Sequence, residues 1–84
     1  MKHAGPAALD KLEPLLAELR KFPLKEKSRG TFYRGARAFL HFHEHGNEFY
    51  ADMRLAGEFE RFPATTARER AALLKKIGAS LKMR

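Results

Sequence analysis

The chain has 84 residues and contains no cysteine. Disulfide bonds and thiolate metal ligands are therefore excluded, and a hydrophobic core has to stabilise the fold. No apolar run approaches the ~20 residues that a membrane-spanning helix needs. Residues 1–6 also lack the apolar segment of a signal peptide. These absences favour a soluble, cytoplasmic protein with one domain over residues 1–84, and we allow for disorder in residues 1–8.

Motifs of the common enzyme classes are missing as well. Neither serine, Ser28 or Ser80, lies in a nucleophile-elbow motif, and no glycine-rich phosphate loop is present. Asp52 could pair with Glu48 or Glu60. Nothing around them, however, indicates the apolar pocket that raises the pKa of a carboxyl group. We therefore expect no enzymatic activity and no cofactor.

One sign of charge is in excess. Lysine and arginine number 17 against 10 aspartates and glutamates, for a formal net charge of +7. Such a balance favours contact with nucleic acid, acidic lipid head groups or an acidic protein. It is equally typical of a basic protein whose charge serves only solubility.

The first element with a clear pattern is an amphipathic helix, in which leucines recur every three or four residues. It can begin at Pro6, or at Asp10 in a capping box with Glu13. Pro14 favours the later start, because a proline inside a helix removes a backbone hydrogen bond. The helix should end at residues 22–23, since the residue before a proline avoids the helical conformation.

A second helix is predicted over residues 67–82, behind a capping box formed by Thr66 and Glu69. Its apolar residues form one stripe, and the opposite face is basic. The cations that we consider for contact with nucleic acid are Arg68, Arg70, Lys75, Lys76 and Lys82.

Between the helices the pattern changes to the two-residue alternation of β-strands. Residues 24–30 are polar and predict a connector. A two-residue turn at 45–46 and a three-residue turn at 56–58 join antiparallel strands. The predicted strands cover residues 31–34, 37–44, 47–55 and 58–62.

The central hairpin has one apolar face. The turn at 45–46 pairs Phe42 with Phe49, Leu40 with Ala51 and Ala38 with Met53, and a one-residue slip would expose all of these residues. The element order is α-β-β-β-β-α. It predicts a two-layer α+β fold, in which both helices cover the apolar face of a four-stranded antiparallel meander.

The opposite, outer face is the candidate functional surface. It combines aromatic and cationic side chains, an arrangement that suits self-association, protein binding or the stacking of single-stranded nucleic acid. Self-association or binding of a protein partner is the leading hypothesis, and nucleic-acid binding is the alternative. The candidate binding residues on this face are Phe32, Arg37, Phe39, His41, His43, Tyr50 and Arg54.

Metal binding is a further hypothesis. His41 and His43 lie two residues apart on one strand, so both imidazoles point to the same face, and the predicted register places Glu48 opposite His43. Gly35, His41, His43 and Glu48 also resemble the first motif of the cupin family. A second cupin motif is absent and the chain is too short for a cupin barrel, so we exclude that fold.

A longer run resembles small uncharacterised bacterial proteins, a likeness that implies no activity or cofactor. It covers residues 30–34, 38–44, 51–55 and 59–62. The alternating strands and the following helix are also similar to the YjbR/MmcQ type of α+β protein, for which DNA binding is suspected. This second similarity concerns the pattern alone, and it assigns no functional residue.

Overall fold

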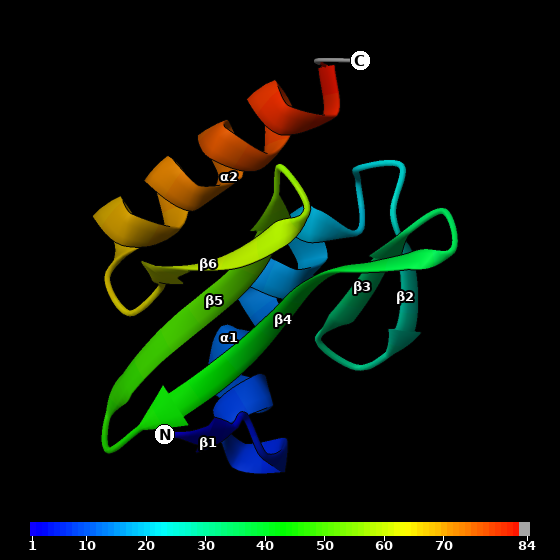
Figure 1. Ribbon diagram of the computed structural model, residues 1–84. Coiled ribbons are helices and arrows are strands. Elements are labelled where there is room, and N and C mark those ends of the chain that lie inside the picture. Colours follow the sequence, from blue (N-terminus) through cyan, green and yellow to red (C-terminus); the bar gives the residue numbers. More distant parts are fainter. Residues whose placement is uncertain (83–84) are drawn as a thin grey trace.

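The computed structural model describes residues 1–82 and shows the predicted α+β class, with helices near both ends of the chain and an antiparallel sheet between them (Figure 1). In the described residues the sheet has six strands rather than the predicted four. The elements are β1 Lys2–His3, α1 Pro6–Leu19, β2 Lys25–Ser28, β3 Thr31–Arg34, β4 Arg37–His45, β5 Glu48–Leu55, β6 Glu58–Pro63 and α2 Ala67–Lys82.

The two additional strands lie at the margins of the sheet. The strand order is β2-β3-β4-β5-β6, and β1 pairs with β4 through Lys2–Glu44 and His3–His43. The prediction of a connector at residues 24–30 is wrong, because most of this segment forms β2. This strand is mostly exposed and rich in charge, as edge strands often are, so it lacks the apolar alternation by which strands are recognised.

The central hairpin keeps the predicted faces but has a different register. Phe42 lies opposite Ala51 and Leu40 opposite Met53, a shift of two residues from the predicted pairs. Gly46 adopts a φ of 60°, as the first central residue of a type II′ turn does, so the turn contains Gly46 and Asn47. Because side chains alternate with a period of two, the shift leaves each of these residues on its predicted face.

A β-bulge changes the faces at the start of β4. Phe32 pairs with Leu40 and Tyr33 with Ala38, which leaves Phe39 as the extra residue. Phe32 is 0% exposed and Phe39 is 3% exposed, so the prediction that they lie on the outer face is wrong. The bulge turns Phe39 into the core, although residues two and four positions later point outward.

The turn from β5 to β6 also differs from the prediction. Leu55 pairs with Glu58, so the turn contains two residues rather than three. Ala56 and Gly57 both have positive φ, at 49° and 93°, as a type I′ turn requires. Phe59 consequently lies opposite Arg54, where it is 38% exposed, instead of opposite Leu55.

Helix α1 begins at Pro6 and includes Pro14, whereas the sequence favoured a start near Asp10. An internal proline costs about 3 kcal/mol. Burial of a leucine contributes roughly 1.5–3 kcal/mol, and the helix buries four of them, so packing outweighs the proline. Those leucines are Leu12, Leu15, Leu16 and Leu19.

The predicted capping box of α2 is confirmed. The Glu69 backbone N–H donates to Thr66 Oγ1 at 3.1 Å, and the Thr66 N–H donates to Glu69 Oε1 at 3.0 Å. The Thr65 N–H also donates to Glu69, and these bonds lower the pKa of the Glu69 carboxyl. The start of α2 is therefore determined locally.

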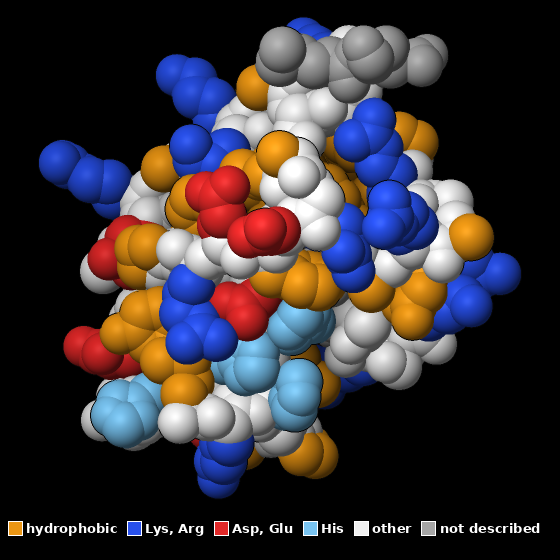
Figure 2. Space-filling model, in the orientation of Figure 1, with side chains coloured by type: hydrophobic (Ala, Val, Ile, Leu, Met, Phe, Trp, Pro, Cys, Tyr) orange, Lys and Arg blue, Asp and Glu red, His pale blue; other side chains and the backbone are white. Residues whose placement is uncertain are grey.

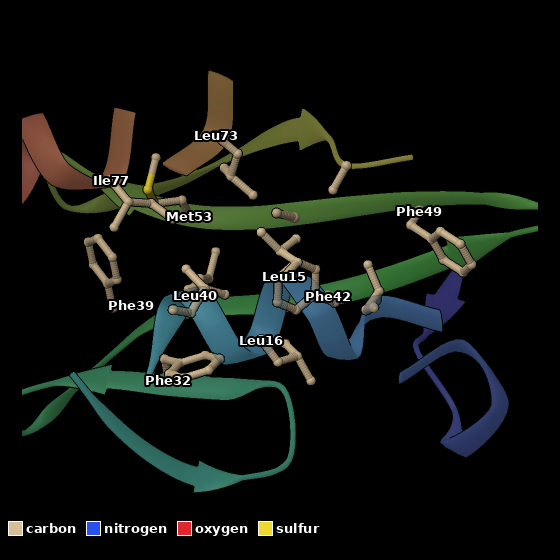
Figure 3. Packing of buried hydrophobic residues seen from close by; sticks show 14 of the residues in the cluster. Leu15, Leu16, Phe32, Phe39, Leu40, Phe42, Phe49, Met53, Leu73 and Ile77 are labelled. Atoms are coloured by element: carbon tan, nitrogen blue, oxygen red, sulfur yellow. The ribbon is translucent and has the colours of Figure 1, made fainter. Parts of the chain in front are cut away.

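Both helices contribute to one core with the inner face of the sheet (Figure 3). Leu73 and Ile77 of α2 are buried in the same cluster as the leucines of α1 and the inward residues of β3, β4 and β5. The side of the sheet turned away from this cluster is called the outer face below. Neither helix in the described residues is long and apolar enough to cross a membrane.

Candidate functional site

Histidine side chains gather on the outer face of the sheet beside an acidic group (Figure 2). Four neighbouring strands bring them together. His41 of β4 lies opposite Asp52 of β5, which in turn lies opposite Arg61 of β6. On the other side of β4, His43 lies opposite His3 of β1. The five residues are called the histidine cluster below.

The carboxylate of Asp52 is the centre of this cluster. Its Oδ2 lies 3.1 Å from His43 Nε2 and 3.5 Å from His41 Nε2. One ligand atom from each of these three residues lies within 4.8 Å of the others. Asp52 is 8% exposed, so water competes little for these contacts. Two imidazole nitrogens and a carboxylate oxygen form a common donor set for transition metals.

Arg61 holds the same carboxylate from the other side. Its Nε donates to Asp52 Oδ1 at 2.8 Å and its Nη2 donates to Oδ2 at 3.0 Å. This bidentate pair lowers the pKa of Asp52 and, together with the coulombic attraction of the histidines, outweighs the opposing effect of burial. Asp52 is therefore ionised at neutral pH, as a metal ligand must be.

The histidines are close enough to influence one another. The His3 ring stacks on His43 with centroids 4.6 Å apart and lies 5.7 Å from His41. Burial lowers the pKa of His41, and Asp52 offsets this only in part, while His43, His3 and Arg61 add to it. At neutral pH His41 therefore carries a neutral imidazole, the form that binds metals.

One buried nitrogen of the cluster has no hydrogen-bond partner. In residues 1–82, His43 Nδ1 is the buried side-chain nitrogen or oxygen atom that makes no hydrogen bond. Its other nitrogen, Nε2, faces Asp52. Unsatisfied buried polar atoms are uncommon in folded proteins and often mark a functional site.

Five of the seven residues predicted for the outer face separate into two groups, and the other two, Arg37 and Arg54, line a hollow at one end of the sheet. His41, His43 and Tyr50 lie there together, whereas Phe32 and Phe39 belong to the core. The loss of these two rings removes the aromatic platform proposed for stacking of bases. Phe59, whose ring is exposed, contacts His41 with centroids 4.9 Å apart.

Glu48, predicted as the third metal ligand, lies elsewhere. It faces His45 at the end of the hairpin and accepts a hydrogen bond of 2.7 Å from the Tyr50 hydroxyl, which raises the pKa of Tyr50. The two-residue change of register puts Asp52 in the position beside the histidines. The correct turn, with glycine at its first position, would have indicated Asp52 from the sequence.

The basic residues of α2 also differ in their environment. Arg70 donates to the Ala64 carbonyl at 2.9 Å and to the Lys11 carbonyl, and it lies over the Phe49 ring, so it connects α2 to α1 and the sheet. Arg68, Lys75, Lys76 and Lys82 are exposed. Lys76 lies over the Phe62 ring at 5.3 Å from its centroid.

His3 and Arg61 were not among the predicted site residues. His3 belongs to a strand of two residues, which is too short to show a periodic pattern. Arg61 could be identified only with the correct pairing of β5 and β6. The resemblances to small bacterial proteins and to the YjbR/MmcQ type stay predictions, because no family model matches the chain and no curated protein or solved structure matches it significantly.

Proposed function

We propose that this protein binds a divalent transition metal ion through His41, His43 and Asp52. The observation that carries the proposal is the convergence of three ligand atoms within 4.8 Å on the outer face. Imidazole nitrogen suits zinc, copper, nickel and iron, and a carboxylate completes a three-ligand set. His3 stacks on His43 from a two-residue strand, so a small movement of the chain brings it in as a fourth ligand.

Arg61 is the competitor for the metal. It donates two hydrogen bonds to Asp52, and the ion has to take at least Oδ2 from it. The Arg61 side chain is 48% exposed, against 11% for Asp52, so the guanidinium can move into solvent while the carboxylate stays in place. Ligation through His43 Nε2 also puts the ring proton on Nδ1, which is buried without an acceptor. We therefore expect a reversible site of moderate affinity rather than a permanently filled structural site.

Self-association and protein binding, the leading hypothesis from the sequence, have less support. Their proposed aromatic anchors, Phe32 and Phe39, are buried. Aromatic and arginine anchors in a desolvated centre supply most of the energy of typical protein interfaces. The outer face retains half-buried histidines and one exposed phenylalanine ring, which suits a small ligand better.

Zinc titration at pH 7.5 tests the metal proposal. The wild-type protein should bind one ion in competition with a chelator. Zinc at 100 times its dissociation constant should add about 2.7 kcal/mol to the free energy of unfolding. His43→Ala should weaken binding at least about tenfold, since loss of a second-shell partner alone costs roughly 10–100-fold. The matched control is His45→Ala, which removes an exposed imidazole of the same strand outside the cluster.

Equal loss of zinc affinity in both histidine variants would show that the metal binds surface imidazoles without a defined site. A second variant, Arg61→Gln, tests whether Arg61 competes with the metal for Asp52 or helps Asp52 to bind the metal. If Arg61 competes for Asp52, this variant should bind zinc more tightly than the wild type, although its own fold is no more stable. Weaker zinc binding by Arg61→Gln would contradict the proposed geometry.

A further inference from the structure

A hollow of about 210 Å³ lies at the end of the sheet opposite the turn between β4 and β5. It is lined by residues next to the turn between β3 and β4 and by residues of the turn between β5 and β6. Three arginines, Arg34, Arg37 and Arg54, line it together with two residues of β4 and two residues of the turn between β5 and β6. Its lining contains no acidic residue.

The turn between β3 and β4 brings two of these cations together. Arg34 and Arg37 are directly opposite each other in the sheet, joined by Gly35 and Ala36. Like charges at opposite positions destabilise a β-hairpin. The φ of 63° at Gly35 suits the first position of a tight II′ turn, so the backbone conformation holds the two arginines at this spacing.

Arg54 is held in place by contacts that are not ionic. Its Nε donates to the Ala38 carbonyl at 2.8 Å and its Nη1 donates to the Gly57 carbonyl at 3.1 Å. The guanidinium also lies 4.4 Å from the centroid of the Phe59 ring. A guanidinium has five N–H groups, and the two hydrogen bonds leave others free. Arg54 is therefore held in a fixed orientation and still has N–H groups available for a ligand.

No carboxylate neutralises the three arginines. Among residues 1–82, Arg20, Arg29 and Arg61 form ion pairs, whereas Arg34, Arg37 and Arg54 form none. The repulsion between closely spaced cations is relieved when an anion binds among them. The planar fork of arginine matches the oxygen atoms of a phosphate group in particular.

We propose that this hollow binds the terminal phosphate of a small phosphorylated molecule. A phosphate monoester carries nearly two negative charges at neutral pH and three acceptor oxygens, a match for three arginines. Arg54 supplies the oriented donor at the base of the site, and Arg34 and Arg37 close on the ligand from the neighbouring turn. The proposal does not depend on the histidine cluster, because the two sites share no residue.

NMR titration at constant ionic strength provides the test. The probes are pyrophosphate and thymidine 5′-monophosphate, with thymidine as the uncharged control and chloride as the control for screening. We expect saturable shifts of the amides of residues 34–38 and 54–57 and of the Arg54 Nε–Hε group with both phosphorylated probes. Thymidine and chloride should produce none. Shifts spread over all lysines and arginines, without saturation, would overturn the proposal.

Two variants distinguish binding at a shaped site from binding through the net positive charge of the protein. Arg54→Lys keeps the positive charge but loses the planar, forked guanidinium group. It should weaken binding of pyrophosphate about tenfold or more, given the strength of hydrogen bonds to charged groups. Arg68→Ala removes one positive charge from the exposed face of α2 and should leave the affinity unchanged. Equal weakening in both variants would assign the binding to net charge and contradict the proposal.

An oligonucleotide with a free 5′-hydroxyl distinguishes the source of the phosphate. Such a strand contains only phosphodiesters, with one negative charge each. Under the proposal it binds the hollow more weakly than thymidine 5′-monophosphate does. Tighter binding of the oligonucleotide, lost in Arg54→Lys, would show that the site recognises the nucleic-acid backbone and would overturn the assignment to a small ligand.

Discussion

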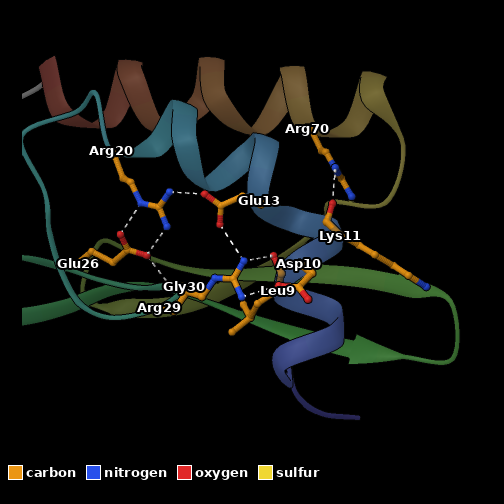
Figure 4. Close-up of polar contacts among 9 residues, drawn as sticks. All are labelled: Leu9, Asp10, Lys11, Glu13, Arg20, Glu26, Arg29, Gly30 and Arg70. Atoms are coloured by element: carbon orange, nitrogen blue, oxygen red, sulfur yellow. Dashed lines mark hydrogen bonds and ion pairs between the residues drawn. The ribbon is translucent and has the colours of Figure 1, made fainter.

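Two clusters of charged residues on this protein are built differently. One joins α1 to the β2–β3 hairpin, where Arg20 bridges Glu13 and Glu26 while Arg29 bridges Asp10 and Glu13 (Figure 4). In this cluster carboxylates outnumber guanidinium groups by three to two. In the histidine cluster a single carboxylate, Asp52, receives contacts from two imidazoles and one guanidinium.

This difference indicates that the first cluster has a structural role, whereas the histidine cluster suits the binding of a ligand. Each arginine of the first cluster has two acidic partners, and Glu26 also accepts a hydrogen bond of 2.9 Å from the Gly30 N–H. The arginines lower the pKa of Glu13 and Glu26, so both stay ionised near neutral pH. This cluster has little capacity for a further ion. The histidine cluster has more donors than acceptors, and the arginine that competes for its carboxylate can move into solvent.

The largest effect on stability is expected for Asp52→Asn. This change removes the charge that Arg61, His41 and His43 share. Breaking a fully buried ion pair costs roughly 3–5 kcal/mol. Since Arg61 is half exposed, we expect a loss of about 2 kcal/mol in the free energy of unfolding, measured by urea denaturation. Zinc binding should be lost in the same variant, and retention of full zinc affinity would contradict the role of Asp52.

A smaller effect is expected for Glu26→Gln in the first cluster. The amide keeps the size of the side chain but loses the ionic pairing with Arg20 and weakens the bond from the Gly30 N–H. We expect a loss of about 1 kcal/mol and faster hydrogen exchange at Gly30. Zinc affinity should not change. A change in zinc affinity would mean that the two clusters are coupled, and the comparison would fail.

The fold class and the inner surface could be predicted from the sequence, because both depend on simple periods. Residues such as Leu40, Phe42 and Met53 recur with the two-residue alternation of strands, and the leucines of α1 recur with the helical period. The cap at Thr66 depends only on residues three positions apart. Such features are local, so they need no knowledge of the partner strand.

The candidate site depends on non-local features that periodicity does not contain. His41 meets Asp52 only in the register set by Gly46. The bulge at Phe39 reverses the face of the preceding residues, and nothing in the alternation of residues 37–44 indicates it. His3 reaches the cluster through a two-residue strand at the margin of the sheet. The pair His41 and His43 was recognised, but its carboxylate partner was not.

A third prediction concerns pH and the histidine cluster. Burial lowers the pKa of His41 below 6.5, so the unfolded chain binds this proton first as the pH falls. The free energy of unfolding should therefore decrease as the pH falls from about 6.5 through the pKa of the folded state. It should increase by the same amount when the pH is raised over the same range. Asp52, whose pKa is also lowered, contributes stability that is lost only below about pH 4.

Comparison with His41→Gln isolates this contribution. Between pH 5 and 7 the stability of the variant should depend less on pH than that of the wild type, because the remaining charged groups around the site, Asp52, His43, His3 and Arg61, are unchanged. Denaturation curves across this range measure the difference. Parallel pH profiles of the two proteins would show that His41 titrates as it does in the unfolded chain.

The smallest effect is expected for Arg29→Ala in the first cluster. Arg29 is exposed and its acidic partners Asp10 and Glu13 are largely in solvent, so its ion pairs contribute little beyond an ordinary surface contact. The melting temperature should fall slightly at low salt. The difference should vanish at 1 M salt, where the screening length is about 3 Å. The stabilisation that zinc provides through the histidine cluster should persist at 1 M salt, since metal–ligand bonds are not screened in this way. A large, salt-independent destabilisation by Arg29→Ala would mean that the first cluster attaches the β2–β3 hairpin to α1 by more than electrostatic attraction.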